Sequence, residues 1–315
     1  MDNKLKWKTE VLKYLNDKIV YSINELPTSI LSNISEIRIR ANGYSSITVK
    51  GENKALYYDK KPVILTPEQV GEIFELVCNN EVFKYENQIK NGYITIPGGH
   101  RVGFCGTAVY FDSKIGSVCN ISSIVFRISR QILNSAREII GNVLVNDKII
   151  STLIVGEPGG GKTTILTDLT RLLSNLGKRC AVIDERGEIC SIYNAAAQKE
   201  IGKFTDVLNE YSKKDGMLCA LRCLSPQVII CDEIGSSDDV DGMLQAMNAG
   251  VPVIATAHAS CEQELYERPQ IERLIDHGGI DKILFLKSSS NPGVINKIIT
   301  VNSYDEDYWD SDYSN

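Results

Sequence analysis

The run STLIVGEPGGGKTT at residues 151–164 constrains this chain more than any other stretch. It contains the spacing G-x-x-x-x-G-K-T, whose fixed letters fall on Gly156, Gly161, Lys162 and Thr163. Glycines at this spacing let successive backbone N–H groups point at phosphate oxygens, and a following helix adds the positive end of its dipole. Apolar residues precede the loop and recur at helical spacing after it, so the sequence predicts a buried strand, a phosphate-binding loop and a helix.

The residues of this loop form the predicted nucleotide site. We expect Lys162 to reach the β- and γ-phosphates of ATP, and Thr163 to ligate Mg²⁺ through its hydroxyl group. ATP and Mg²⁺ are therefore the predicted cofactors. The residues expected to contact the nucleotide are Gly156, Glu157, Pro158, Gly159, Gly160, Gly161, Lys162, Thr163 and Thr164.

Three further apolar runs follow the loop, and each ends in polar residues: 180–183, 228–231 and 253–255. Such runs, alternating with helical segments, predict a mainly parallel sheet with helices on both faces. Ligands bind at the carboxyl ends of the strands in these sheets. We therefore expect Asp232 to help hold Mg²⁺, Glu233 to activate the attacking water and His258 to sense the γ-phosphate.

The first 130 or so residues show a different pattern, with helical spacing at the start and then a period of two. The alternation in SEIRIR places Arg38 and Arg40 on one face of a strand. The run at 121–130 predicts another strand, in which Arg127 and Arg130 point to opposite faces. These patterns indicate a small α+β domain that carries arginines at several strand ends.

Together the patterns predict an α/β fold: a P-loop nucleoside triphosphatase with a mainly parallel sheet flanked by helices, preceded by a smaller α+β domain. The expected parts are an N-terminal helical segment, the small domain, the ATPase domain and an acidic tail: residues 1–32, 33–132, 133–300 and 301–315. The simplest interpretation of the tail is a disordered, solubilising segment, and a partner-binding role is the alternative.

Composition narrows the functional classes. The formal charge is −6, from 34 basic and 40 acidic residues, which argues against a general affinity for nucleic acid. The nine cysteines are scattered without C-x-x-C pairs, which favours a reducing cytosol. No run approaches the roughly 20 apolar residues of a membrane-spanning helix. We therefore expect a cytoplasmic protein that reaches a membrane only through partners.

The series GEPGGGKTT, DERGEI, LRCLSPQVIICDEIG and ATAHA, in this order and spacing, resembles the secretion and pilus-assembly ATPases, which are hexameric P-loop motors. The resemblance implies that Glu185 and Glu188 form an acidic box and that Arg222 is the arginine before the catalytic strand. It also implies that Glu233 is the catalytic glutamate and that His258 is the functional histidine. Glu188 is the catalytic candidate of the acidic box and Glu185 a metal ligand. In that family arginines of the N-terminal domain complete the nucleotide site, and the candidates here are Arg101, Arg127 and Arg130.

The N-terminal segments EIRIR, GGHRVGFCGTA and ISSIVFRISR resemble, more closely, a sporulation family of endospore-forming bacteria. This resemblance implies self-association into a hexameric ring and a place beside membrane proteins of a channel complex between mother cell and forespore. The leading hypothesis is therefore an ATPase. Two alternatives stay open: a nucleotide-dependent protein that binds single-stranded nucleic acid through Arg38, Arg40 and Arg101, and a scaffold that binds ATP without hydrolysing it.

Overall fold

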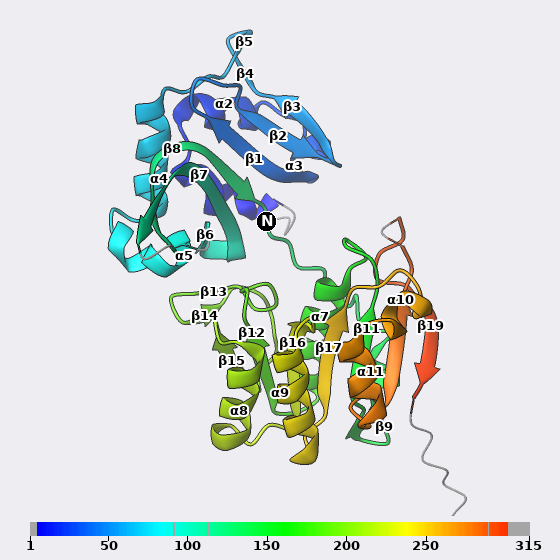
Figure 1. Cartoon of the computed structure of the whole chain (residues 1–315). Helices are drawn as coiled ribbons and strands as arrows, with labels where there is room; N and C mark the ends of the chain where they lie inside the picture. The colour runs from blue at the N-terminus through cyan, green and yellow to red at the C-terminus, as the bar shows by residue number, and fades with distance from the viewer. Residues whose placement is uncertain (1–4, 91, 112–113, 289, 302–315) are drawn as a thin grey trace, which may run out of the picture. The chain divides into compact units, whose positions relative to one another are not determined.

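The structure is a computed structural model of the 315-residue chain, and it describes residues 5–90, 92–111, 114–288 and 290–301 (Figure 1). The chain divides into two compact units. Unit 1 comprises Met1–Arg130 and Ser191–Gln198, and unit 2 comprises Gln131–Cys190 and Lys199–Asn315. The short return of residues 191–198 to unit 1 has no counterpart in the divisions expected from sequence.

Unit 1 is built on a six-stranded antiparallel sheet in the order β3-β2-β1-β8-β7-β6. Its strands are β1 (Ile34–Arg40), β2 (Ser46–Val49), β3 (Glu52–Ala55), β6 (Tyr93–Ile96), β7 (His100–Phe111) and β8 (Lys114–Arg127). Two small hairpins add β4 (Tyr57–Tyr58) with β5 (Lys61–Pro62), and β13 (Ile192–Tyr193) with β14 (Ala196–Ala197). Its helices are α1 (Trp7–Val11), α2 (Asp17–Asn24), α3 (Thr28–Leu31), α4 (Pro67–Val77) and α5 (Glu86–Lys90).

One face of this sheet forms the core of unit 1. Ile37 and Ile39 of β1 are fully buried, and they share a hydrophobic cluster with Phe126 of β8. Trp7 and Ile19, from the first helices, belong to the same cluster. The N-terminal helices are therefore part of the small domain rather than a separate segment, because their apolar faces supply part of its core.

The strand predicted at 121–130 both begins and ends earlier in the structure, where β8 spans Lys114–Arg127. β8 ends at Arg127, so the alternation of faces does not extend to Arg130. Arg127 instead pairs in register with Arg101 of β7 and with Glu36 of β1, and directly paired residues share a face of the sheet. Arg38 and Arg40 lie on this same face, as their spacing from Glu36 requires.

Unit 2 contains a seven-stranded sheet in the order β15-β12-β16-β17-β11-β18-β19. The strands are β11 (Thr152–Val155), β12 (Cys180–Asp184), β15 (Thr205–Asn209), β16 (Val228–Glu233), β17 (Val253–Ala257), β18 (Lys282–Leu286) and β19 (Ile295–Thr300). All neighbours are parallel except β18 and β19. A two-stranded sheet adds β9 (Leu144–Val145) and β10 (Lys148–Ile149). The predicted fold class, with its mainly parallel sheet, is confirmed.

Helices cover both faces of the parallel sheet. They are α6 (Ile140–Val143), α7 (Lys162–Asn175), α8 (Lys213–Cys223), α9 (Ser237–Asn248), α10 (Glu262–Tyr266) and α11 (Pro269–Asp276). Figure 1 shows α8, α9 and α11 side by side, and their apolar residues join a cluster with Leu153 and Val155 of β11. Ile154, between them, is fully buried on the opposite face, which α7 covers.

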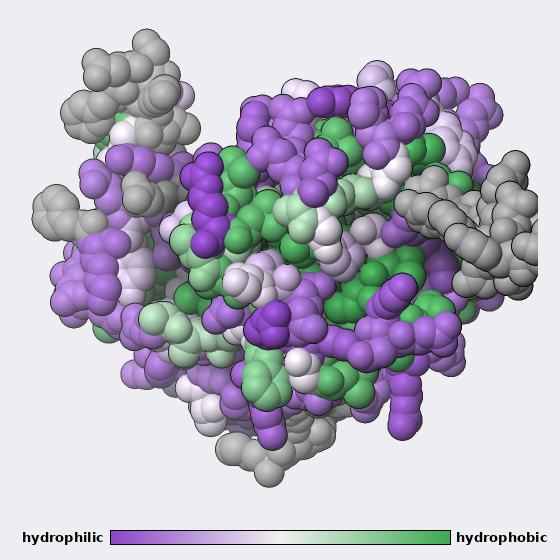
Figure 2. All heavy atoms as spheres, turned by 90° about the horizontal axis from the view of Figure 1, so that it is seen from below, coloured by the Kyte–Doolittle hydropathy of each residue, from purple (hydrophilic) through white to green (hydrophobic). Residues whose placement is uncertain are grey.

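None of the helices within the described residues is long and apolar enough to cross a membrane. Figure 2 views the molecule from below relative to Figure 1, and hydrophobic residues there are interspersed with hydrophilic ones. Large exposed apolar side chains in unit 2 include Leu176 and Phe204, which are 59 % and 54 % exposed.

Candidate functional site

The predicted site residues of unit 2 gather at one edge of the sheet because neighbouring parallel strands end there together. Val155 at the end of β11 pairs with Ala257 of β17, and Thr256 of β17 pairs with Glu233 of β16. The phosphate-binding loop, Asp232, Glu233 and His258 therefore follow or close adjoining strands. This is the edge at which such sheets bind ligands.

The backbone of the loop has the conformation that its glycines permit. Gly159 and Gly161 have φ values of 78° and 89°, in the left-handed region that favours glycine. Gly161 is the residue before α7, so the N–H groups of the first helical turn face the loop. The connection between β18 and β19 also packs against the loop, since Gly293 donates its N–H to the carbonyl of Gly160 at 3.0 Å. A side chain at Gly161 would lie 3.0 Å from the nitrogen of Gly293.

Lys162 is 6 % exposed and lies within the loop. Its Nζ donates to the carbonyls of Gly156 and Glu157 at 2.6 and 2.9 Å, and contacts His258 Nδ1 at 2.7 Å. Burial lowers the pKa of Lys162 from its ordinary value, and the charge of Glu233 opposes this effect. The ammonium group is therefore held at the loop by neutral carbonyl oxygens. Phosphate oxygens can replace them, because charged acceptors form stronger hydrogen bonds.

The contact with Lys162 identifies one acceptor on His258. An ammonium group can only donate, so Nδ1 of the imidazole accepts from Lys162. The other ring nitrogen, Nε2, lies 3.1 Å from Glu233 Oε2. Lys162, His258 and Glu233 thus lie in contact one after another, from the phosphate-binding lysine to the predicted catalytic glutamate.

The acidic box is held by a residue that the sequence interpretation passed over. Asp184, fully buried at the end of β12, accepts three backbone N–H bonds, from Glu188 at 2.8 Å, Ile189 at 3.1 Å and Cys190 at 2.8 Å. Thr167 of α7 also donates to the carbonyl of Ile189. The turn that carries Glu188 is therefore fixed both to the sheet and to the helix that follows the phosphate-binding loop.

Lys213 is a second residue that the sequence interpretation missed. Its buried Nζ lies 2.5 Å from Glu185 Oε2 and 3.1 Å from Asp232 Oδ1. Burial by itself lowers the pKa of Lys213, but the hydrogen bond that Lys213 donates to Glu185 and the charge of Asp232 outweigh burial and raise the pKa above its ordinary value. Burial raises the pKa of Asp232, and the charge of Lys213 opposes that rise.

The residues at this edge fit the Mg²⁺ that accompanies a nucleotide. Within the described residues, no group of three or more His, Cys, Asp or Glu side chains could hold a metal by itself. Mg²⁺ in nucleotide sites needs only one or two protein oxygens, since phosphate and water supply the others. Asp232 Oδ1 is buried beside the Lys213 ammonium group, so the second carboxylate oxygen, Oδ2, is the one suited to ligate the metal. Thr163, the other expected ligand, is the second residue of α7 and directly follows Lys162.

The predicted arginines are divided between the two units: Arg222 is in unit 2, and Arg101, Arg127 and Arg130 are in unit 1. Arg222 is exposed near the end of α8, nine residues after Lys213 and so about 13 Å farther along the helix. Within its own unit, the structure does not bring Arg222 to the strand ends. Arg101 and Arg127 lie on the open face of the sheet in unit 1, and Arg101 stacks on Tyr93 at 4.6 Å from the ring centroid.

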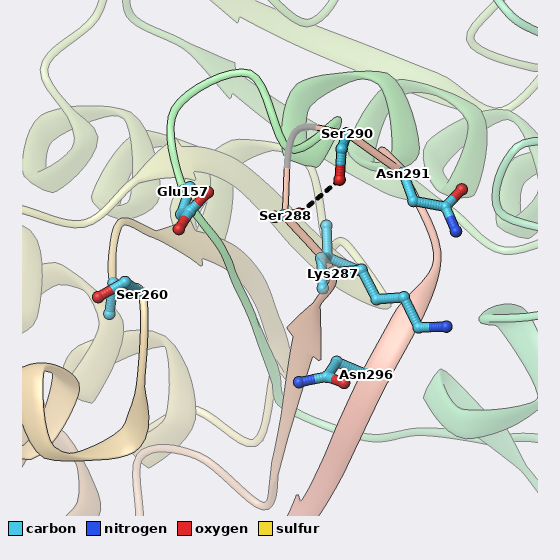
Figure 3. Close-up of a pocket in the computed structure, with 9 residues that line it drawn as sticks. Glu157, Ser260, Lys287, Ser288, Ser290, Asn291 and Asn296 are labelled. Atoms are coloured by element: carbon cyan, nitrogen blue, oxygen red, sulfur yellow. Dashed lines mark hydrogen bonds between the residues drawn. The ribbon is translucent and has the colours of Figure 1, made fainter.

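A pocket of about 460 Å³ adjoins the phosphate-binding loop (Figure 3). Its walls come from the loop, from the segment after β17 and from the β18–β19 connection: Glu157, Ala259, Ser260, Leu286, Lys287, Ser288, Ser290, Asn291 and Asn296. Ser288 and Ser290 are joined by a hydrogen bond of 2.8 Å. Of the predicted nucleotide contacts only Glu157 lines it, so this pocket is a neighbour of the phosphate site rather than the site itself.

The fold defines a class, the P-loop proteins built like secretion and pilus ATPases. The chain is similar in structure to the Legionella pneumophila ATPase DotB, with a TM-score of 0.52 and 18 % identity over 80 % of this chain and 72 % of that one. It is also similar to the pilus retraction motor PilT with bound ADP, with a TM-score of 0.55 and 15 % identity over 80 % and 74 %. At these identities the likeness establishes a shared fold.

The chain belongs to the family described as "Sporulation stage III, protein AA", whose model matches residues 6–305. It is 34 % identical over 304 residues to "Stage III sporulation protein AA" of Bacillus subtilis (strain 168), which covers 95 % of each chain. It is 30 % identical over 167 residues to "Uncharacterized protein ycf45" of Cyanidium caldarium, covering 52 % of this chain and 48 % of that one. Both resemblances inferred from the sequence motifs are confirmed.

Proposed function

We propose that the chain hydrolyses ATP in a Mg²⁺-dependent reaction at the carboxyl ends of its parallel strands. The observation that carries this proposal is the series Lys162–His258–Glu233, which connects the phosphate-binding loop to a carboxylate at the end of β16. The fold shared with the ATPase DotB and with an ADP-bound motor supports it.

The residues divide the reaction between them. Lys162 leaves the loop carbonyls for the phosphate oxygens, which are stronger acceptors because they are charged. Glu233 orients a water molecule and takes its proton as the water oxygen bonds to the γ-phosphorus and the bridging P–O bond breaks, releasing ADP and phosphate. His258 Nε2 contacts Glu233 Oε2 at 3.1 Å and so keeps that carboxylate beside the loop. Mg²⁺, held by Thr163 and Asp232, would neutralise charge on the phosphate oxygens.

Two substitutions test the catalytic assignment. Glu233→Gln should lower steady-state ATP turnover by about 100-fold or more while the affinity for ADP is retained, because the amide cannot take the proton. Lys162→Ala should lower turnover and weaken nucleotide binding together. His277→Gln is the matched control, because His277 is exposed and directly follows the end of α11. It should leave turnover and nucleotide binding unchanged. Parental turnover in both site variants would refute the assignment.

Self-association into a ring is the second part of the proposal. Arg222, Arg101, Arg127 and Arg130 are the residues we assign to contacts with the nucleotide site of a neighbouring subunit, since charged guanidinium groups stabilise transferring phosphate. The exposed position of Arg127, 66 % accessible at its side chain, is compatible with this role. The mass of the assembly, with and without a non-hydrolysable ATP analogue, tests it. A monomer under both conditions would exclude a ring.

The biological setting follows from the family. We propose that hydrolysis powers or assembles a channel complex between mother cell and forespore, with the chain in the cytoplasm and bound to membrane proteins of that complex. The relative named for stage III of sporulation supports this setting. Co-purification from sporulating cells should recover membrane proteins with the parental chain. Loss of sporulation in a Glu233→Gln strain would show that the ATP cycle is needed.

The arginines on the open sheet face of unit 1 favour one other function, binding of single-stranded nucleic acid. Arg38, Arg40, Arg101 and Arg127 share that face with Glu36, and Arg101 stacks on a tyrosine. Basic faces with aromatic rings suit single strands, whereas the net charge of −6 opposes such binding. Titration with single-stranded DNA at low salt shows whether the arginines or the net charge prevails. Absence of binding at low salt would exclude this function.

A further inference from the structure

Lys213 is a buried lysine to which the reaction above gives no task. Its side chain is 5 % exposed, and it is the first residue of α8, directly after the N-cap Ser212. Burial disfavours an ammonium group, and the first turn of a helix is where the helix dipole disfavours positive charge. Two local rules are broken at one residue. Such conflicts are expected where a site, rather than the fold alone, sets the residue type.

The neighbouring residue shows what an ordinary lysine does at this position. Lys214, one residue along α8, has a side chain that is 35 % exposed. It pairs with Asp238 and Asp241 of α9 at 2.8 and 3.3 Å. Lys214 thus follows the common pattern of a surface ion pair, which contributes little to stability.

The two carboxylates that contact Lys213 belong to two neighbouring strands of the sheet. Glu185 follows β12 and Asp232 lies in β16, and these strands are neighbours in the sheet. Nζ is 2.5 Å from Glu185 and 3.1 Å from Asp232. Lys213 therefore joins the acidic box to the strand that carries Glu233, and its charge compensates the two carboxylates.

A metal bound by both carboxylates would conflict with this arrangement. An ion that both Glu185 and Asp232 ligate would lie within a few ångströms of the Lys213 ammonium group, and two positive charges at that separation repel strongly in a buried site. Glu185 already has its charge compensated by the shorter of the two contacts. Asp232 faces Lys213 through Oδ1 at the longer of the two contacts, so its second oxygen, Oδ2, is the carboxylate oxygen with capacity for a metal.

We propose that Lys213 is a positioning residue of the nucleotide site: it orients Asp232 towards the nucleotide's metal and uses Glu185 as its counter-ion, so that Glu185 stands outside the ligand set. This inference rests on the proposed Mg²⁺-dependent function of the same site. Lys213 contacts neither nucleotide nor metal and acts through Asp232.

The test measures how much Mg²⁺ strengthens ADP binding. The affinity of a fluorescent ADP analogue is determined with and without Mg²⁺ for the parent, for Lys213→Met and for Lys213→Arg. We expect Mg²⁺ to tighten binding to the parent and Lys213→Met to lose about tenfold or more of that gain, as when a residue that orients a metal ligand is removed. Affinity without Mg²⁺ should change less than about twofold. Lys213→Arg should recover part of the gain.

Three controls decide between positioning and mere structure. Lys214→Met should match the parent. Asp232→Asn should abolish the Mg²⁺ gain, whereas Glu185→Gln should keep most of it. If Lys213→Met folds poorly, the double variant Lys213→Met, Glu185→Gln removes one unpaired carboxylate and should fold while still lacking the gain.

The proposal is overturned if Lys213→Met or the double variant keeps the parental Mg²⁺ gain. It is also overturned if Mg²⁺-free affinity and the urea midpoint fall in parallel with that gain, because Lys213 would then be structural only. A parent without any Mg²⁺ gain overturns it as well. A parent that shows the gain but no ATP turnover would instead sink the proposed hydrolysis and leave the role of Lys213 standing.

Discussion

The two sheets of the chain carry their polar residues in different places. In unit 1, Glu36, Arg38 and Arg40 alternate along β1 with buried isoleucines, so the charged residues of this strand are spread over one face of the antiparallel sheet. In unit 2, β11 and β12 are buried at every residue, and charged side chains gather where the strands end. A sheet covered on both faces can present chemistry only at its ends. A half-covered sheet presents a surface instead, and this suits contact with a partner.

Two adjacent residues of β8 give the largest test of this contrast. Phe126 is fully buried against the helices of unit 1, whereas Arg127 lies on the polar face. Phe126→Ala should lower the free energy of unfolding by about 3–5 kcal/mol, because it removes a large apolar side chain and leaves a cavity. Arg127→Ala should change it by less than about 0.5 kcal/mol. Urea unfolding of both variants makes the comparison, and equal losses would mean that both faces are covered.

The corresponding test in unit 2 is the buried carboxylate at the end of β12. Asp184→Ala leaves three backbone N–H groups without their acceptor and should cost about 2–4 kcal/mol of unfolding free energy. Asp184→Asn should cost less, since its single carbonyl oxygen can still serve the two N–H groups bound to Oδ1. Guanidinium unfolding measures both. A variant Asp184→Ala as stable as the parent would show that water replaces the acceptor and that the strand end is open.

The smallest expected effect is a pH dependence in unit 1. His100 is 1 % exposed, accepts the Ser129 N–H at Nδ1 and contacts Glu10 of α1 at 3.0 Å through Nε2. Burial lowers the pKa of His100, while the hydrogen bond and charge of Glu10 oppose this and nearby Arg130 and Lys6 add to it. The pKa of a histidine in the unfolded chain is about 6.5. Below that pH the unfolded chain therefore binds a proton that the folded chain does not.

Stability should consequently fall as the pH drops through about 6.5, and the fall should end below the folded pKa. The unfolding free energies of the parent and of His100→Gln at pH 7.5 and 5.5 measure this. The parent should lose more stability on acidification than His100→Gln, and His277→Gln should behave like the parent. The same loss in all three proteins would contradict the assignment.

Sequence patterns found the elements whose signal is local. The loop glycines, the apolar runs of β11, β12, β16 and β17, and the alternation in β1 each follow from periodicity within a few residues. The same reasoning missed β15, β18 and β19, and it placed a strand at 121–130 where β8 spans Lys114–Arg127. β15 and β19 are edge strands with partly exposed residues, so their apolar pattern is weak.

The site shows the same division. Lys162, Glu233 and His258 were predictable because each follows a buried run or a glycine loop. Lys213 was not, since Ser-Lys-Lys at the start of a helix resembles an ordinary surface segment. Its only local sign is a cation in the first turn, which is too common to single out a residue.

By itself the sequence determined that the chain has the glycine loop of a P-loop protein on a parallel sheet and that carboxylates follow at strand ends. It also determined that the chain belongs to a sporulation family with the fold of secretion ATPases. These are consequences of backbone conformation and of apolar periodicity, which neighbouring residues specify. Only the tertiary structure decided that Lys162 reaches His258, that Asp184 holds the acidic box and that Lys213 is buried between Glu185 and Asp232. Those contacts join residues far apart in the chain, and burial sets their strength by excluding water, which no local pattern records.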